Sequence, residues 1–285
     1  DIKRRLRYGK EHQVTGFLAR TDWEGVQDWT CFDNLNMVNL YAIAAYAENE
    51  NTSEEEIYLR WLQGEHMLDE RLSPGQLKTC VQTVKEIMDE TWPIVEKTNF
   101  VNGCLFSNDS CMHLTPEQFT FIGGTHHSLS EWDPEKKDAL EMSVENIARI
   151  IEDKEEAHVK CEKLVDRVVA GNMGLTEDAY EKMKEHFEFM RWYVRGFRLT
   201  ARGYCFGRYV TEKNAADMLV EGKTANVLLE ETIHEMEKYR EGLLQTTFIK
   251  KYPFDAQLNP ERVAFYTNSL KRMLAQGKKV EIVED

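Results

Sequence analysis

The chain has 285 residues, of which 30% are charged and 42% are hydrophobic, and its formal net charge is −14. This balance is typical of a globular protein that can bury a sizeable core. The acidic charge argues against nucleic acid and against an anionic membrane surface as partners, and no apolar run approaches the length of a membrane span. Six cysteines are too few for a disulfide scaffold. Cys104 and Cys111 flank a short polar loop, and the sequence is compatible both with a disulfide between them and with two separate thiols.

The first fifty residues have the pattern of one β/α unit. Residues 1–13 resemble the end of an amphipathic helix, because Ile2 and Leu6 alternate with basic residues. Residues 14–20 are apolar or small and have no helical period, which predicts a short buried strand. A loop dense in Asp, Trp, Glu and Arg follows, and then a helical run from about Asp33 to Glu48.

This predicted strand has no evident partner in the rest of the chain. A single strand cannot satisfy its own backbone N–H and C=O groups, and the remaining sequence is almost entirely helical in pattern. We therefore expect residues 1–34 to be the last β/α unit of a larger barrel or sheet. Residues 35–285 are expected to form a helical domain appended to it.

Helix starts are marked by capping residues. The predicted helix after Ser53 has a capping box completed by Glu56, and its spacing predicts that Ile57, Trp61, Leu62 and Leu68 are buried. Four prolines directly follow a capping residue, as expected at the first position of a helix. These pairs are Ser73-Pro74, Thr115-Pro116, Asp133-Pro134 and Asn259-Pro260.

Long helices with short connections are predicted for the rest of the chain. Helical spacing runs from Leu77 to Val95, a long helix is expected over 134–170, and the next begins after Thr176. Two more are expected over about 211–245 and 260–276, with a β-like tail at 278–285. Because helices of this length with short connections pack against their neighbours in sequence, the pattern predicts a mainly α chain with an antiparallel helical bundle.

Two short motifs carry a resemblance to a known family. The run Asn39-Leu40-Tyr41 and the segment 52–57 with Trp61 follow a barrel-like strand and a Trp-rich loop. This arrangement resembles the C-terminal part of α-glucuronidase-like glycoside hydrolases, over about residues 14–65 in its motifs and only in architecture thereafter. In that family a (β/α)8 barrel precedes a long helical domain, so the resemblance implies that the orphan strand belongs to a (β/α)8-type barrel. The family's catalytic carboxylates lie on earlier barrel strands, so we expect this chain to have no glycosidase activity on its own.

The resemblance also implies a sugar site at the end of the strand. Active sites of barrels lie at the C-terminal ends of their strands, which places Arg20, Asp22, Trp23, Glu24 and Trp29 on the rim. Trp offers a flat face to a sugar ring, and the charged groups can bind hydroxyls or a uronate carboxylate. The expected partners are a polysaccharide fragment or uronic-acid oligosaccharide, the remainder of the barrel and a second copy in a homodimer. The alternative is that the two Trp side chains pack the loop onto the helical domain.

A second interpretation is an independent helical bundle that acts as a binding protein or a di-metal protein. Glu-x-x-His pairs on two helices, with a Glu from each of two others, would match a di-iron site. The residues are Glu155/His158, Glu231/His234, Glu86 and Glu185. Such pairs also arise by chance in a Glu-rich chain, and we expect neither metal nor cofactor. The two interpretations differ in the pairing of residues 14–20. Pairing in a sheet with strands from another chain would favour the barrel, and packing against helices without strand partners would favour the independent bundle.

Overall fold

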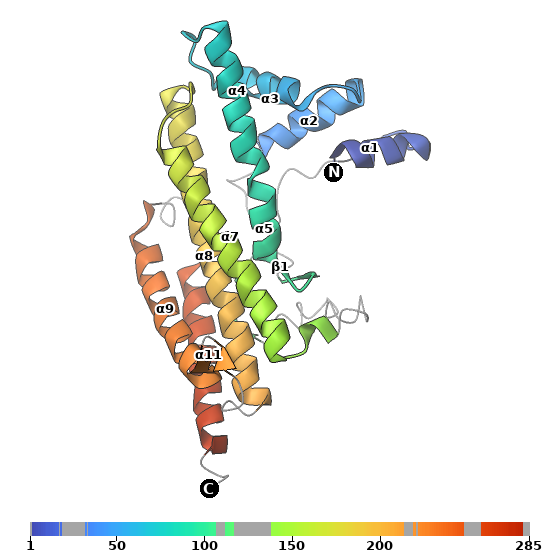
Figure 1. The fold of residues 1–285 in the computed structure, drawn as a ribbon. Helices are drawn as coiled ribbons and strands as arrows, with labels where there is room; N and C mark the ends of the chain where they lie inside the picture. The colour runs from blue at the N-terminus through green and yellow to red at the C-terminus, as the bar shows by residue number, and fades with distance from the viewer. Residues whose placement is uncertain are drawn as a thin grey trace. The chain divides into compact units, whose positions relative to one another are not determined.

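A computed structural model describes residues 2–16, 18, 32, 34–106, 112–116, 138–213, 219–220, 222–247 and 258–281. The prediction of a mainly helical chain is confirmed (Figure 1). The chain divides into two compact units. Unit 1 contains Asp1–Thr91 and Leu164–Glu188, and unit 2 contains Trp92–Lys163 and Phe189–Asp285. The boundary at residues 34/35 stays a prediction.

Unit 1 is built on α1 (Ile2–Glu11), α2 (Met37–Glu48), α3 (Glu54–Gly64) and α4 (Pro74–Asp89). Two predicted helix starts in unit 1 are confirmed: the Ser53 hydroxyl accepts from the backbone N–H of Glu56 at 3.2 Å, and α4 begins with a Ser73–Gln76 capping box. The box predicted at Ser53 is only half formed, because the Glu56 side chain pairs with Arg60. The expected core residues of α3 are buried. After α3 it is Met67 that is buried, while Leu68 is half-buried and forms an isolated bridge with Leu175.

The helical spacing predicted from Leu77 to Val95 is interrupted. The structure ends α4 at Asp89 and begins α5 (Thr91–Asn99), with Ile94 and Thr98 as its buried residues. Trp92, predicted to continue the apolar stripe, is 61% exposed. Pro93 explains the break, since a proline has no N–H to donate to the preceding turn.

Unit 2 begins with α5 and a hairpin of β1 (Phe100–Val101) and β2 (Cys104–Leu105). The 3₁₀ turn η3 (Asp138–Leu140) precedes α7 (Val144–Val169), which is followed by α8 (Glu177–Glu212). A second hairpin, β3 (Leu219–Val220) and β4 (Lys223–Thr224), leads into α9 (Ala225–Gln245), and α11 (Pro260–Glu281) comes last.

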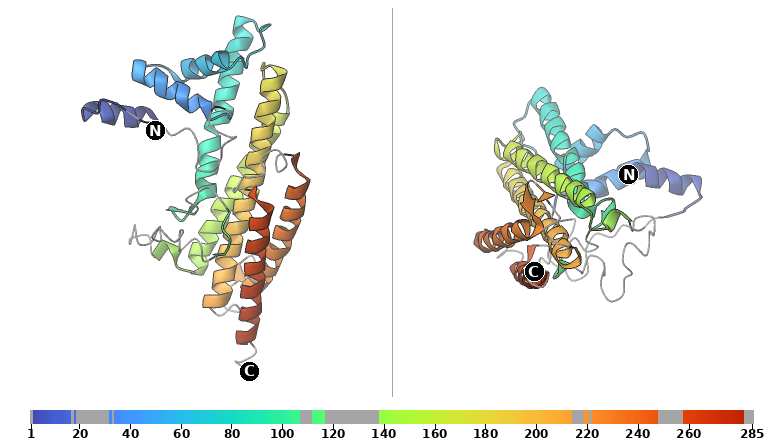
Figure 2. Two further views of the ribbon diagram at one scale, coloured as in Figure 1. Left: turned by 180° about the vertical axis from the view of Figure 1, so that it is seen from behind. Right: turned by 60° about the horizontal axis from the view of Figure 1, so that its bottom comes forward.

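Within unit 2 the helices form the predicted antiparallel bundle. On α7 and α8, Glu162 pairs with Arg191 and Glu155 with Arg198, so the two helices run in opposite directions. The second of these arginines also pairs with Glu235, which places α9 beside α8. Helix α11 packs on α9 and on α8, as the two views in Figure 2 also show. Close packing at the α8–α11 contact requires Gly203, because a Cβ there would lie 2.8 Å from two side chains of α11.

The predicted strand over 14–20 is not formed by its described residues. Val14, Thr15, Gly16 and Leu18 have no strand partner among the described residues, and Val14 and Leu18 are 60% and 97% exposed. The backbone N–H of Val14 instead bonds the Gly9 carbonyl at 2.9 Å and closes the end of α1. Without a ladder partner, nothing holds this segment extended and buried.

Three predicted helix boundaries also need correction. The expected helix over 134–170 begins as α7 only at Val144, after Ser143, whose hydroxyl accepts from the backbone N–H of Asn146 at 3.1 Å. The helix expected over 211–245 is replaced at its start by the β3–β4 hairpin, which turns at Gly222 with a φ of 74°. The β-like tail at 278–285 was wrong for residues 278–281, which continue α11.

Candidate functional site

A cleft of about 400 Å³ lies within unit 1. Its lining comes from the turn that leads into α2, the end of α3 and the start of α8. The floor is apolar and buried, formed by Leu35, Trp61, Met67 and Ala179. Because Trp61 is only 2% exposed, it seals the floor and offers no face on which a ring could stack.

The rim of the cleft carries the charged and polar groups Glu65, His66, Asp178 and Lys182. The first two are placed by the way α3 ends. The backbone N–H of Glu65 bonds the Trp61 carbonyl at 3.0 Å, and His66 adopts a left-handed φ of 54°. This turn reverses the chain, so that Glu65 and His66 project beyond the helix end while Met67 turns into the core.

The other two rim residues are placed by the start of α8. The Thr176 hydroxyl accepts from the backbone N–H of Ala179 at 3.4 Å and caps the helix. Asp178 and Lys182 then follow four residues apart, which puts them on one face of α8. The side chains of His66, Asp178 and Lys182 make no hydrogen bond or ion pair with any residue that the structure describes. These three groups are therefore available to a ligand.

Glu65 differs from them because it already has one partner. The Tyr41 hydroxyl, on α2, donates to its Oε1 at 3.0 Å. Burial, and then the hydrogen bond to Glu65, raise the pKa of Tyr41, so the phenol stays protonated and donating at neutral pH. The other carboxylate oxygen of Glu65, Oε2, has no hydrogen-bond partner in the described part of the chain and can accept a hydrogen bond from a ligand.

The sequence-predicted rim residues Arg20, Asp22, Trp23, Glu24 and Trp29 lie outside the described residues. The cleft begins just after them in the chain, with Asn34, Leu35 and Met37 in its lining. Sequence reasoning missed the four rim residues Glu65, His66, Asp178 and Lys182 of the cleft. Two of them could have been found from the segment Gly64-Glu65-His66. Gly64 marks the end of the helix, and the two residues after it are polar although ending a helix does not require polar side chains there.

The di-metal interpretation fits the structure poorly. Glu155 pairs with Arg198 at 2.6 Å, Glu231 with Lys223 at 2.6 Å, and Glu86 with Arg167 at 2.8 Å. The Nδ1 atom of His158 lies 3.8 Å from Glu162. Those three carboxylates thus pair with cationic side chains. Among the described residues, no group of three or more His, Cys, Asp or Glu is arranged to hold a metal ion.

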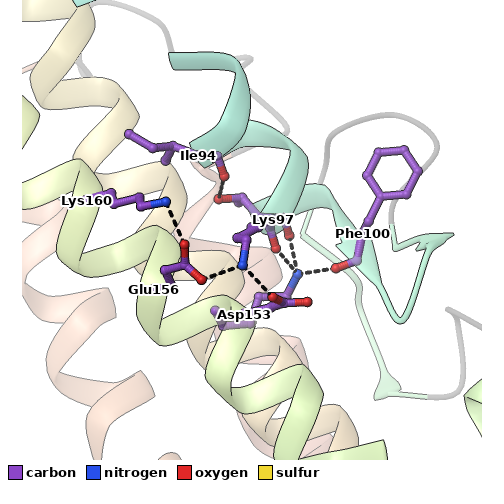
Figure 3. Close-up of polar contacts among 8 residues, drawn as sticks. Ile94, Lys97, Phe100, Asp153, Glu156 and Lys160 are labelled. Carbon is purple, nitrogen blue, oxygen red and sulfur yellow. Dashed lines mark hydrogen bonds and ion pairs between the residues drawn. The ribbon is translucent and has the colours of Figure 1, made fainter. Parts of the chain in front are cut away.

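A second unusual titratable group is Lys154 of α7, in unit 2. Its side chain is 1% exposed, and its Nζ donates to the backbone carbonyls of Lys97, Thr98 and Phe100 (Figure 3), at 2.8 Å for Thr98. Burial is the main reason that the pKa of Lys154 falls to about 7. A depressed lysine pKa can mark a catalytic amine. Here the amine donates to two carbonyls at the end of α5 and one at the start of β1, and it is closed to solvent, so Lys154 is a structural anchor.

The neighbours of this anchor form a separate polar network. Lys97 pairs with Asp153 at 2.8 Å and also with Glu156, which in turn pairs with Lys160 at 2.6 Å (Figure 3). These contacts join α5 to the surface of α7, while Lys154 joins them from within. The network holds α5 and the β1–β2 hairpin in place, so its role is structural. The candidate binding site is therefore the cleft of unit 1.

None of the described helices combines the length and the apolar character needed to cross a membrane. Comparisons of the chain with protein-family models, with curated proteins and with solved structures gave no match.

Proposed function

We propose that this chain is the helical C-terminal portion of a carbohydrate-active, glycoside hydrolase-like barrel enzyme. In this proposal it closes the barrel, lines one side of the sugar site and has no activity alone. The support is the motif resemblance over residues 14–65, the mainly helical architecture and the chemistry of the cleft in unit 1.

The observation that carries the proposal is the set of unpaired polar groups around the cleft. Carboxylates such as Asp178 accept hydrogen bonds from sugar hydroxyls, and the Lys182 ammonium donates to hydroxyls or to a uronate carboxylate. A volume of about 400 Å³ lies within the range of small-molecule sites. The small exposed parts of Leu35 and Met67 can contact C–H groups of a sugar, although Trp61 gives no stacking platform. Binding of this kind needs no nucleophile or metal.

The proposal is tested with D-glucuronate and D-glucose, which differ only in the carboxylate at C6. We expect the chain to bind glucuronate with a dissociation constant of about 1 mM, equivalent to about 4 kcal/mol, and glucose more weakly. Lys182→Met removes the cation on the rim and is expected to weaken glucuronate binding about tenfold while leaving glucose binding nearly unchanged. Titration calorimetry measures both affinities.

Lys184→Met is the matched control. This lysine lies on the same helix, pairs with Glu181 and does not line the cleft, so its loss should leave both affinities unchanged. Failure of the unmodified chain to bind either sugar would contradict the proposal. An equal loss of affinity in the two variants would show that only general charge attraction is being measured.

The second candidate function is an independent helical binding protein. It is favoured by Val14–Gly16 and Leu18, which are exposed and pair with no strand among the described residues, whereas the barrel interpretation requires them to form a strand. The two candidate functions differ in whether a barrel pairs with residues 14–20. If the preceding barrel is added back, the first predicts that residues 14–20 gain slow amide exchange, because they join a ladder; the second predicts no change.

A further inference from the structure

We propose that Tyr41 is a positioning residue of the cleft, which fixes the Glu65 carboxylate for the ligand and depends on Gly64 for access to it. This inference rests on the proposed carbohydrate-binding role of the cleft. Tyr41 does not line the cleft itself; it acts from α2 through one hydrogen bond to a residue that does.

The geometry shows why position 64 is glycine. A Cβ at Gly64 would lie 2.1 Å from the Tyr41 hydroxyl oxygen and 2.9 Å from the ring carbon that bears it. Gly64 is not among the residues with a positive φ, so its backbone conformation is open to any residue. The requirement is therefore steric: only glycine lets the tyrosine hydroxyl pass the end of α3 and reach Glu65.

The consequence is a carboxylate held in one orientation. Glu65 projects from a helix end, where its side chain would otherwise sample many rotamers and lose that freedom when a ligand binds. The hydrogen bond from Tyr41 to Oε1 restricts it beforehand and leaves Oε2 to accept from a ligand hydroxyl. Preorganisation of this kind raises affinity without adding a contact to the ligand.

The test is a double-mutant cycle with D-glucuronate as the probe. Tyr41→Phe keeps the ring and removes the hydroxyl, and it is expected to weaken binding three- to fivefold with almost no change in melting temperature. In a Glu65→Ala background the same substitution is expected to have no effect on affinity, since there is no carboxylate to position. Gly64→Ala should weaken binding at least as much as Tyr41→Phe, by displacing the ring.

Tyr58→Phe is the control, because this tyrosine lies on α3, contacts Asp89 at 3.5 Å and is not part of the cleft lining. If the unmodified chain does not bind glucuronate, the proposed function fails and this inference fails with it. If it binds but Tyr41→Phe weakens binding equally with and without Glu65, the function stands and the positioning role is wrong. A fall in melting temperature with unchanged affinity would make Tyr41 a packing residue and would equally overturn the inference.

Discussion

Replacing Lys154 by methionine is expected to lower the free energy of unfolding by about 3–5 kcal/mol at pH 9. Methionine matches the length of the buried stem but donates no hydrogen bond, so the carbonyls of Lys97, Thr98 and Phe100, which share the two N–H donors of the neutral amine at this pH, lose their partner. A buried polar group left unpaired costs about 1–3 kcal/mol. The losses fall on one junction, where α5 and the β1–β2 hairpin meet α7 (Figure 3).

The size of this effect should depend on pH. Burial lowers the pKa of Lys154 from 10.5 to about 7, so between these values the unfolded chain holds a proton that the folded chain has released. Stability therefore rises with pH across that window, is complete above about 10.5 and is lost as the pH falls through 7. The methionine variant lacks this contribution. Its destabilisation is expected to grow by about 2–3 kcal/mol from pH 6 to pH 9, at about 1.4 kcal/mol per pKa unit.

Urea unfolding of both proteins at pH 6, 7.5 and 9 measures this difference. Lys163→Met is the matched control, since Lys163 lies on the same helix, is exposed and has no partner in the described structure. Its stability should follow that of the unmodified chain at every pH. A destabilisation by Lys154→Met that stays constant with pH would mean that the three carbonyls keep the amine charged throughout.

The helices were predictable from the sequence where the signal is local. Ser53 and Ser73 mark their helix starts by side-chain caps that form within four residues, and the apolar period of α3 fixes which face is buried. Pro93 was also a local signal, but the apolar residues on either side of it suggested continuity. Propensity and period are weak guides where one residue interrupts an otherwise regular pattern.

The strand at 14–20 and the rim of the cleft could not be predicted in the same way. A strand is defined by its ladder partner, and an apolar sequence such as that after Val14 says nothing about whether a partner is present. The rim joins Glu65 and His66 to Asp178 and Lys182, more than one hundred residues later. That meeting depends on the Leu68–Leu175 bridge, a tertiary contact that no local pattern encodes.

Substitution of two neighbouring arginines of α8 is expected to have different effects on stability, a loss at one position and no loss or a small gain at the other. Arg198 donates to Glu155 at 2.6 Å and to Glu235 at 3.3 Å, so it satisfies two carboxylates on two helices. Arg202 lies 3.6 Å from the same Glu155, too far for a hydrogen bond, and its Nε has no hydrogen-bond partner. The Arg202 side chain is nevertheless only 8% exposed.

Arg198→Met should therefore destabilise the chain by about 2 kcal/mol, because Glu235 loses this cation and Glu155 keeps only the longer contact with Arg202 at 3.6 Å. Arg202→Met should leave stability unchanged or raise it by about 1 kcal/mol, since it removes a desolvated guanidinium that is poorly compensated and keeps an apolar stem against the Phe206 ring. Glu155 retains Arg198 in that variant. Melting temperatures of the two single variants at pH 7 measure the contrast, and a larger loss for Arg202→Met than for Arg198→Met would contradict it. The double variant tests whether the arginines act through their shared carboxylate: removal of both should cost more than the sum of the single effects, because Arg202 then no longer remains to compensate Glu155.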